Sequence, residues 1–265
     1  MRNFNHLLLL VFCACLLSGC EKEKKYPKGN PKTESDDPQT EVIVPTNIVF
    51  RLAGDSTCCP YPEEARPQTG WGECIAEALG QGVQVENYAV GGESTKSFAD
   101  EGKWAALAAE IQTGDVVLIQ FGHNDEKSDE EHHTDPATTY KEYLTTFINE
   151  TREKGGIPVL LTSICRRSYH TLGAPNRTHG DYPAAMRELA EATETALVDA
   201  EDLTYVWLAQ LGKERSEDYF VMYKRGATEA DNTHLTDIGA KAVAEMIAKE
   251  LKKLEPWKTT VVDNQ

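Results

Sequence analysis

Four polar residues spread along the chain have the types and spacing that ester hydrolysis requires. Ser56 is a candidate nucleophile. Asp231 and His234 are three residues apart, so the carboxylate can hold one imidazole nitrogen and leave the other free to take a proton from a serine. Asn124 carries a side-chain amide that can donate to a developing oxyanion. Each residue alone fits an ordinary turn or cap, and only the set indicates catalysis.

The elements that would position these residues are short strands alternating with amphipathic helices. This alternation predicts an α/β domain with a mostly parallel five-stranded sheet and helices on both faces. Apolar runs predict strands at 47–53, 83–88, 115–121, 157–164 and 196–200. Helical spacing predicts helices at 71–79, 97–111, 136–154, 183–194 and 236–254.

Three candidate segments directly follow predicted strands. Ser56 follows the first strand at an expected strand-to-helix turn, Gly91–Gly92 follow the second, and Asn124 follows the third. Asp231 and His234 are expected in the loop before the last helix. Since ligands bind beyond the carboxyl ends of such strands, the sequence predicts one site at this edge of the sheet.

The chain resembles the SGNH (GDSL-like) hydrolases, and within them the rhamnogalacturonan acetylesterase group. The family blocks are Gly54-Asp55-Ser56-Thr57, Gly92, Gly122-His123-Asn124-Asp125 and Asp231-Asn232-Thr233-His234. Matches to the narrower group are Gly70-Trp71-Gly72-Glu73, Asn87-Tyr88-Ala89, Lys96-Ser97-Phe98, Arg166-Arg167-Ser168 and Gly180-Asp181-Tyr182-Pro183. The resemblance covers roughly residues 47–250.

The resemblance implies a flavodoxin-like three-layer α/β/α sandwich and a serine carbohydrate esterase that needs no cofactor. Ser56 would be the nucleophile, His234 the general base and Asp231 its partner. The oxyanion hole would consist of the backbone N–H groups of Ser56 and Gly92 and the side chain of Asn124. The implied substrate is an acetylated polysaccharide or oligosaccharide of the plant cell wall, with pectic rhamnogalacturonan favoured.

One position departs from the group. Many members have Arg after the glycine of the second block, where this chain has Glu93. An acidic residue near the oxyanion hole puts the identity of the polysaccharide in doubt more than the catalysis.

A group of basic residues after the fourth predicted strand is a candidate for binding the substrate. It contains Arg166, Arg167, His170, Arg177 and His179. Arginine can clamp a galacturonate carboxylate with two hydrogen bonds. The alternative is that these arginines pair with local acidic residues.

Three other functions stay open. The same catalytic residues could remove acetyl groups from xylan or another glycan. They could also serve an acyltransferase or a lipase. A different class is a glycan-binding lipoprotein without catalysis, against which the intact Ser56, Asp231 and His234 argue.

The first residues predict export and a lipid anchor. Residues 1–19 have a charged start and a short apolar run, which is typical of a signal peptide. The run ends in Leu17-Ser18-Gly19-Cys20, which resembles a bacterial lipobox, so Cys20 would carry the lipid and hold the protein on a membrane in the periplasm or at the cell surface. Ordinary cleavage without a lipid is the alternative. Residues 20–45 are polar and proline-containing and predict a flexible tether, which leaves 46–265 as the hydrolase domain.

Charge and cysteine content narrow the partners further. The formal net charge is −16, with no basic stripe, which argues against nucleic acid. An oxidising compartment would permit disulfides among Cys58, Cys59, Cys74 and Cys165, in three possible pairings. No metal site is expected, because the histidines at 132 and 133 lie in an acidic loop without ligand spacing.

Overall fold

Five parallel strands form the central sheet in the order β2-β1-β3-β4-β5. This is the strand order of flavodoxin-like folds, and it confirms the predicted parallel five-stranded sheet. The computed structural model describes residues 48–222 and 230–254. The strands are β1 (Val49–Gly54), β2 (Gln84–Asn87), β3 (Val116–Gln120), β4 (Ile157–Leu161) and β5 (Ala196–Val198).

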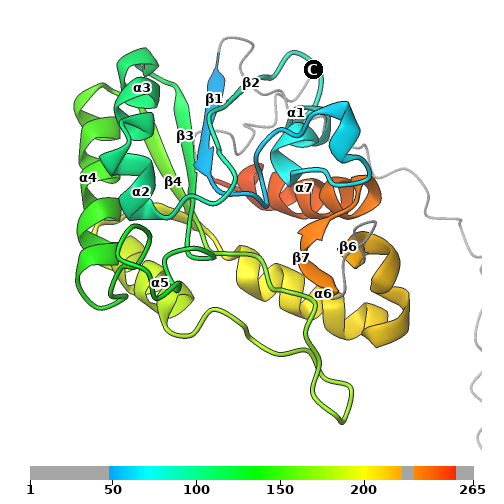
Figure 1. Cartoon of the computed structure of the whole chain (residues 1–265). Helices are drawn as coiled ribbons and strands as arrows, with labels where there is room; N and C mark the ends of the chain where they lie inside the picture. The colour runs from blue at the N-terminus through cyan, green and yellow to red at the C-terminus, as the bar shows by residue number, and fades with distance from the viewer. Residues whose placement is uncertain (1–47, 223–229, 255–265) are drawn as a thin grey trace, which may run out of the picture. The chain divides into compact units, whose positions relative to one another are not determined.

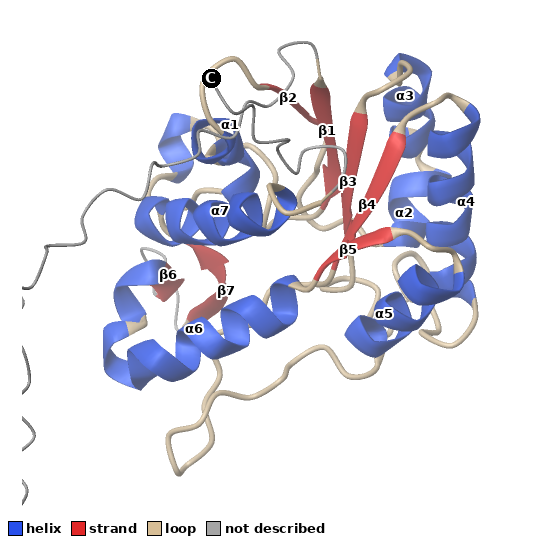
Figure 2. Cartoon of the chain, turned by 180° about the vertical axis from the view of Figure 1, so that it is seen from behind, coloured by secondary structure: helices blue, strands red, loops and turns tan. Residues whose placement is uncertain are grey.

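Helices cover both faces of this sheet, as Figures 1 and 2 show from opposite sides. One layer contains α2 (Thr95–Asp100), α3 (Lys103–Glu110), α4 (Thr139–Glu153) and α5 (Tyr182–Ala192). The other contains α1 (Ile75–Leu79), α6 (Ala200–Arg215) and α7 (Asp237–Leu251). The three-layer α/β/α arrangement is therefore confirmed.

Successive side chains along the strands pack alternately into two separate hydrophobic cores. Leu118 on β3 packs with the layer of α1 and α7, and its neighbour Ile119 packs with the layer of α2 to α5. On β4 the same alternation separates Leu161 from Leu160. Because both faces of these strands are buried, they read in the sequence as continuous apolar runs.

The structure differs from the predicted elements in several places. The expected helix at 97–111 is two helices, α2 and α3, because Gly102 between them adopts a left-handed conformation with φ of 77°. The turn after β1 does not open a helix, since Pro60 and Pro62 lack the backbone donors that a helix needs. Helix α6 was not predicted, because its buried face includes Ala200 and Thr204, which give a weak apolar pattern.

The segment with Asp231 and His234 was expected to be a loop and is instead a strand. β7 (Asp231–Leu235) pairs antiparallel with β6 (Phe220–Met222), outside the central sheet. Its residues are mostly polar, so no strand pattern is visible in the sequence. Three short 3₁₀ turns complete the described elements, at Glu63–Ala65, Trp71–Glu73 and Glu217–Tyr219.

The predicted signal peptide at 1–19, Cys20 and the tether at 20–45 lie outside the described residues. Within the part that is described, no helix is long and apolar enough to cross a membrane.

Candidate active site

Ser56, His234 and Asp231 form a hydrogen-bonded chain beyond the carboxyl end of β1. Nε2 of His234 lies 3.0 Å from Oγ of Ser56. On the other side of the ring, Nδ1 lies 2.8 Å from Oδ2 of Asp231. In this arrangement a carboxylate can fix the imidazole tautomer while the second nitrogen faces the hydroxyl. The structure thus brings together the three residues that the sequence indicated.

Strand β7 holds the acid and the histidine in register. Oδ1 of Asp231 accepts the backbone N–H groups of Thr233 at 3.2 Å and of His234 at 3.0 Å. Between the acid and the histidine, the carbonyl of Asn232 accepts the backbone N–H of Arg167 at 2.7 Å. Although burial alone would raise the pKa of Asp231, its hydrogen bonds with His234 hold that pKa well below the usual range, so the carboxylate stays charged.

Ser56 lies on a tight turn that directly follows β1. The carbonyl of Asp55 accepts the N–H groups of Cys58 at 3.2 Å and Cys59 at 3.0 Å, which closes the turn. The hydroxyl of Tyr61 donates to the carbonyl of Ser56 at 2.7 Å. The backbone of the serine is therefore fixed on both sides.

Side chains from two neighbouring strands brace the same turn. Gln120, at the end of β3, donates to Oγ1 of Thr57 at 2.7 Å and accepts from the indole of Trp71 at 2.9 Å. Asn87, at the end of β2, donates to the carbonyl of Cys58 at 2.7 Å. These contacts explain why the Trp71 and Asn87 segments accompany the serine block in the sequence.

Two further loops bring possible oxyanion donors to the serine. A side chain at Gly91 would begin 3.7 Å from Cβ of Ser56, and Gly92 has a φ of 93°, which favours glycine. Nδ2 of Asn124 donates one hydrogen to the carbonyl of Glu93 at 2.8 Å. Among the described residues, no hydrogen bond uses the backbone N–H of Ser56 or Gly92. These two groups and the second amide hydrogen of Asn124 are therefore available to a ligand.

A buried acid and two buried histidines lie behind this site. Oδ2 of Asp55 is 3.3 Å from Nδ1 of His123, whose ring centroid is 4.2 Å from that of His179. Burial and the neighbouring His179 lower the pKa of His123 to about 4, against the opposing effect of Asp55. His123 is therefore neutral near pH 7.

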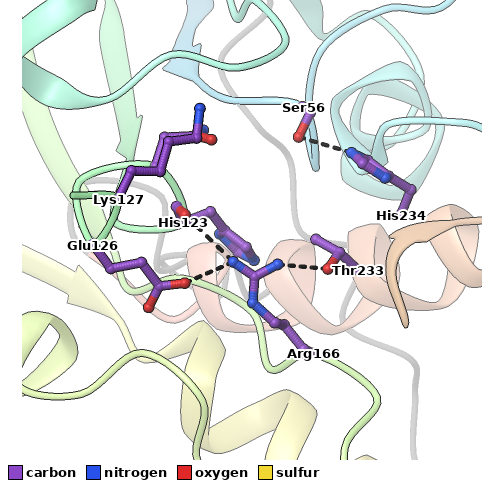
Figure 3. Close-up of a pocket in the computed structure, with 8 residues that line it drawn as sticks. Ser56, His123, Glu126, Lys127, Arg166, Thr233 and His234 are labelled. Atoms are coloured by element: carbon purple, nitrogen blue, oxygen red, sulfur yellow. Dashed lines mark hydrogen bonds and ion pairs between the residues drawn. The ribbon is translucent and has the colours of Figure 1, made fainter. Parts of the chain in front are cut away.

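A cleft of about 470 Å³ opens in front of the serine (Figure 3). The sequence did not indicate Glu126 and Lys127 in its wall, and it gave no role to His123 and Thr233, which lie inside the family blocks. The first two directly follow the block that ends at Asp125, which is the signal that could have indicated them. The described residues that line the cleft are all polar: Ser56, His123, Asn124, Glu126, Lys127, Arg166, Thr233 and His234.

Of the five residues expected to form a basic patch, Arg166 alone lines this cleft. Its guanidinium donates to Oε1 of Glu126 at 2.7 Å, to Oγ1 of Thr233 at 2.5 Å and to the carbonyl of His123 at 3.3 Å. Although burial opposes it, the nearby His179, whose Nδ1 is 3.5 Å from Oε2 of Glu126, and the hydrogen bond from Arg166 lower the pKa of Glu126 below its usual range.

The other members of the expected patch do not line the cleft. Arg167 is buried, where it donates to Oγ of Ser216 at 3.0 Å and pairs with Glu217 at 2.9 Å. His179 is buried with Nε2 2.9 Å from the carbonyl of Ile164. The remaining two are His170, which is exposed, and Arg177, which pairs with Glu201 and Asp202. All three arginines are thus paired with acidic residues, as in the alternative that the sequence left open, but these acids lie far away in the sequence.

Glu93 also lies away from the cleft wall. Its carboxylate accepts from Oγ of Ser97 at 2.7 Å and pairs with Nζ of Lys103 at 3.0 Å. The residue is 7% exposed. The acidic side chain therefore supports the start of α2 and α3 instead of facing the oxyanion donors.

The four cysteines of the described part are free thiols. Burial raises the pKa of Cys59 to about 11 and that of Cys165 to about 12, which disfavours the reactive thiolates. None of the disulfides that the sequence allowed is formed among Cys58, Cys59, Cys74 and Cys165.

One group of metal-ligating residue types lies on the loop before α4. Ligand atoms of Asp129, Glu131 and His132 are within 4.8 Å of one another. Nδ1 of His132 is already 2.5 Å from Oδ1 of Asp129, and the two acids are exposed. Exposed acidic residues often lie this close together without an ion, so these three residues alone do not indicate a metal site.

The order and geometry of these segments match a known family. A model of the GDSL-like lipase/acylhydrolase family matches residues 52–242, which include every block around the site. The chain belongs to this family.

Individual proteins of known sequence or structure are also similar to this chain. The rhamnogalacturonan acetylesterase RhgT of Bacillus subtilis (strain 168) is 39% identical over 209 residues, which cover 77% of this chain and 89% of RhgT. The crystal structure of the B. subtilis protein YxiM has a TM-score of 0.68 at 30% identity and covers 78% of this chain, which spans 56% of YxiM. The crystal structure of Axe2, an acetylxylan esterase from Geobacillus stearothermophilus, has a TM-score of 0.58 at 19% identity. The match covers 83% of this chain and 98% of Axe2, and the two proteins share the fold.

Proposed function

We propose that this GDSL-like hydrolase is a serine esterase that removes O-acetyl groups from a plant cell-wall polysaccharide, with rhamnogalacturonan as the favoured substrate. The observation that carries the proposal is the 3.0 Å contact between Nε2 of His234 and Oγ of Ser56 at the wall of an open polar cleft. The 39% identity to RhgT, a rhamnogalacturonan acetylesterase, supports the choice of substrate.

In the proposed reaction, Ser56 attacks the acetyl carbonyl while His234 takes its proton. Asp231 holds the imidazole and stabilises its charged form. The sugar hydroxyl leaves with the proton from His234, and the acetyl group stays on Ser56. Water then attacks the acetyl-enzyme with His234 again as base, which releases acetate and restores the serine.

The oxyanion of both tetrahedral intermediates would be held by three donors. These are the backbone N–H groups of Ser56 and Gly92 and the free amide hydrogen of Asn124. Removal of one such donor in other hydrolases costs about 2.7–4 kcal/mol in the transition state. Because these donors are preorganised by the turn and by the Glu93 carbonyl, they need no rearrangement as charge develops.

The polar cleft favours a sugar ester over a long-chain lipid ester. A lipase needs an apolar groove for the acyl chain, and the lining of the cleft, as far as the structure describes it, has no apolar residue. A deacetylase of xylan would use the same catalytic residues, so an experiment must decide which of the two polysaccharides is the substrate.

The decisive measurement is acetate release from acetylated rhamnogalacturonan and acetylated xylan, side by side. Wild-type protein should release acetate from rhamnogalacturonan at the higher kcat/KM, and Ser56→Ala should abolish release from both. Ser128→Ala, which removes an exposed hydroxyl from the loop beyond Lys127, is the matched control and should keep activity. Release from xylan alone would overturn the pectic substrate, and activity in Ser56→Ala would overturn the nucleophile.

We also propose that the protein is exported and held on a membrane by a lipid on Cys20, with the tether at 20–45 between the lipid and the hydrolase domain. The support is the lipobox-like Leu17-Ser18-Gly19-Cys20 at the end of an apolar run. Metabolic labelling with palmitate should mark the wild-type protein, and Cys20→Ala should be unlabelled and partition into the aqueous phase of a detergent extraction. A wild-type protein without label would overturn the anchor.

A further inference from the structure

Among the described residues that line the catalytic cleft, cationic side chains outnumber anionic ones, although the whole chain is acidic. The chain carries a formal net charge of −16. In the cleft wall, Arg166 and Lys127 are cationic and Glu126 is anionic. Arg166 and Glu126 form an ion pair with a contact of 2.7 Å, so these two charges offset each other. Of the described residues in the wall, Lys127 is the cation without such an offsetting partner.

Lys127 has unused hydrogen-bonding capacity. Its Nζ donates one long hydrogen bond, 3.3 Å, to the carbonyl of Gly92. No carboxylate among the described residues pairs with it. An ammonium group carries three donors, so two remain for a ligand. Figure 3 shows Lys127 on the opposite side of the view from Ser56 and His234, and all three residues line the cleft of about 470 Å³.

We infer that Lys127 binds the carboxylate of a uronate residue of the substrate while an acetyl ester of the same or the adjacent sugar reaches Ser56. The inference rests on the proposed esterase function and deepens it, because it names the residue that selects acidic over neutral glycans. A half-buried ammonium without an anionic partner is poorly compensated, and a carboxylate forms a short, charge-assisted hydrogen bond with it. Xylose and other neutral sugars offer hydroxyl groups alone.

The contact with Gly92 suggests a second role that the test must separate. Lys127 could simply hold the loop that carries the Gly92 N–H. In that case its loss would slow hydrolysis of every acetyl ester, charged or neutral. Lys127→Gln separates the two roles, since an amide can still donate to the Gly92 carbonyl but has no charge. Lys127→Arg keeps the charge.

The experiment compares acetylated rhamnogalacturonan oligosaccharides as free acids with the same oligosaccharides after methyl esterification of their uronates. Wild-type protein should prefer the free acid by about tenfold or more in kcat/KM. Lys127→Gln should reduce this preference to about twofold or less, mainly through KM, and Lys127→Arg should restore most of it. Lys241→Gln removes an equal charge from the exposed face of α7 and should keep the full preference.

The outcomes distinguish this inference from the proposed function. If wild-type protein hydrolyses p-nitrophenyl acetate but releases acetate from neither form of the oligosaccharide, the proposed polysaccharide esterase itself is wrong. If it releases acetate from both forms and Lys127→Gln loses the same factor on each, the polysaccharide function stands and the uronate contact is wrong. A wild-type protein without preference for the free acid would also overturn the contact.

Discussion

Oδ2 of Asp55 lies 3.3 Å from Nδ1 of His123, and this buried contact joins the two segments that carry Ser56 and Asn124. Each partner is the residue directly before a proposed catalytic group, and both have an exposure of 4% or less. The relative position of nucleophile and oxyanion donor is therefore coupled through this buried pair. The contribution of His123 to the free energy of unfolding depends on pH, because its pKa is lower in the folded protein than in the unfolded chain.

In the variant His123→Gln, the free energy of unfolding should fall less steeply as the pH is lowered. In the unfolded chain an imidazole takes up a proton near pH 6.5, whereas burial lowers the pKa of His123 to about 4 in the folded protein. Between pH 6.5 and pH 4 the unfolded state therefore binds more protons than the folded state. The contribution of His123 to the free energy of unfolding is fully present above pH 6.5 and is lost as the pH falls toward 4. The expected loss from His123 is up to about 3 kcal/mol.

Urea unfolding at pH 7 and pH 4.5 measures the effect. Asp125, whose pKa burial raises to about 6, contributes a slope of the opposite sign, so the readout is the difference between wild type and variant. His170→Gln changes an exposed histidine and is the control, with an expected slope like that of wild type. Equal slopes in wild type and His123→Gln would show that His123 is protonated in both states.

Asp231→Asn should lower kcat by about 10⁴-fold, with little change in KM. The amide cannot stabilise the imidazolium and favours the wrong tautomer of His234, as in other enzymes with this triad. The measurement is steady-state hydrolysis of p-nitrophenyl acetate, with circular dichroism to check the fold. A loss of less than about tenfold in a folded variant would remove Asp231 from the proposed mechanism.

Asn124→Ala should lower kcat by about 10²–10³-fold, the usual effect of removing one oxyanion donor. KM should change little, because the donor acts on the charge that develops in the transition state. Asn176→Ala removes an amide that bonds to Ser168 in a surface loop and is the matched control. A variant at position 124 whose KM rises while kcat is retained would assign the amide to ground-state binding.

Arg166 and Arg167 are neighbours in the sequence but should respond differently to replacement by alanine. Arg166→Ala removes a cleft residue and leaves the carboxylate of Glu126 without its 2.7 Å partner, so KM for oligosaccharide substrates should change severalfold. Arg167→Ala removes a buried guanidinium that bonds to Ser216 and Glu217, and should lower the free energy of unfolding by about 2–3 kcal/mol. Thermal unfolding and steady-state kinetics on both variants test the contrast, which fails if Arg167→Ala changes KM without loss of stability.

The sequence predicted the sheet well because its central strands are buried on both faces. Runs such as Val116–Gln120 are apolar at nearly every position, and parallel pairing follows from the helices between them. The carboxyl-edge rule then placed Ser56 and Asn124 at one edge without any knowledge of contacts. Strand β7 escaped prediction because its pairing depends on backbone hydrogen bonds, which leave no pattern in the polar segment Asp231–Leu235.

The substrate side of the site was harder to predict because charge in a sequence does not reveal its partner. Arg166, Arg167 and Arg177 look equivalent in sequence, yet acids at 126, 217, 201 and 202 pair with them from distant positions. Lys127 was overlooked among the acidic residues of its loop, and only the tertiary structure shows that it lacks an acidic partner among the described residues. Pairing across the fold, rather than local composition, decides which cation is free to bind substrate.

Glu93→Gln should affect stability more than activity. The carboxylate accepts from Oγ of Ser97 at 2.7 Å and pairs with Lys103 at 3.0 Å, and it does not line the cleft. The amide retains an acceptor for Ser97 but loses the ion pair, so the free energy of unfolding should fall by about 1 kcal/mol while kcat/KM changes less than about threefold. Glu93→Arg should be more destabilising, because it places a cation against Lys103. The measurements are urea unfolding and oligosaccharide kinetics on both variants. A Glu93→Gln variant with unchanged stability and a severalfold change in KM would mean that the carboxylate reaches the substrate.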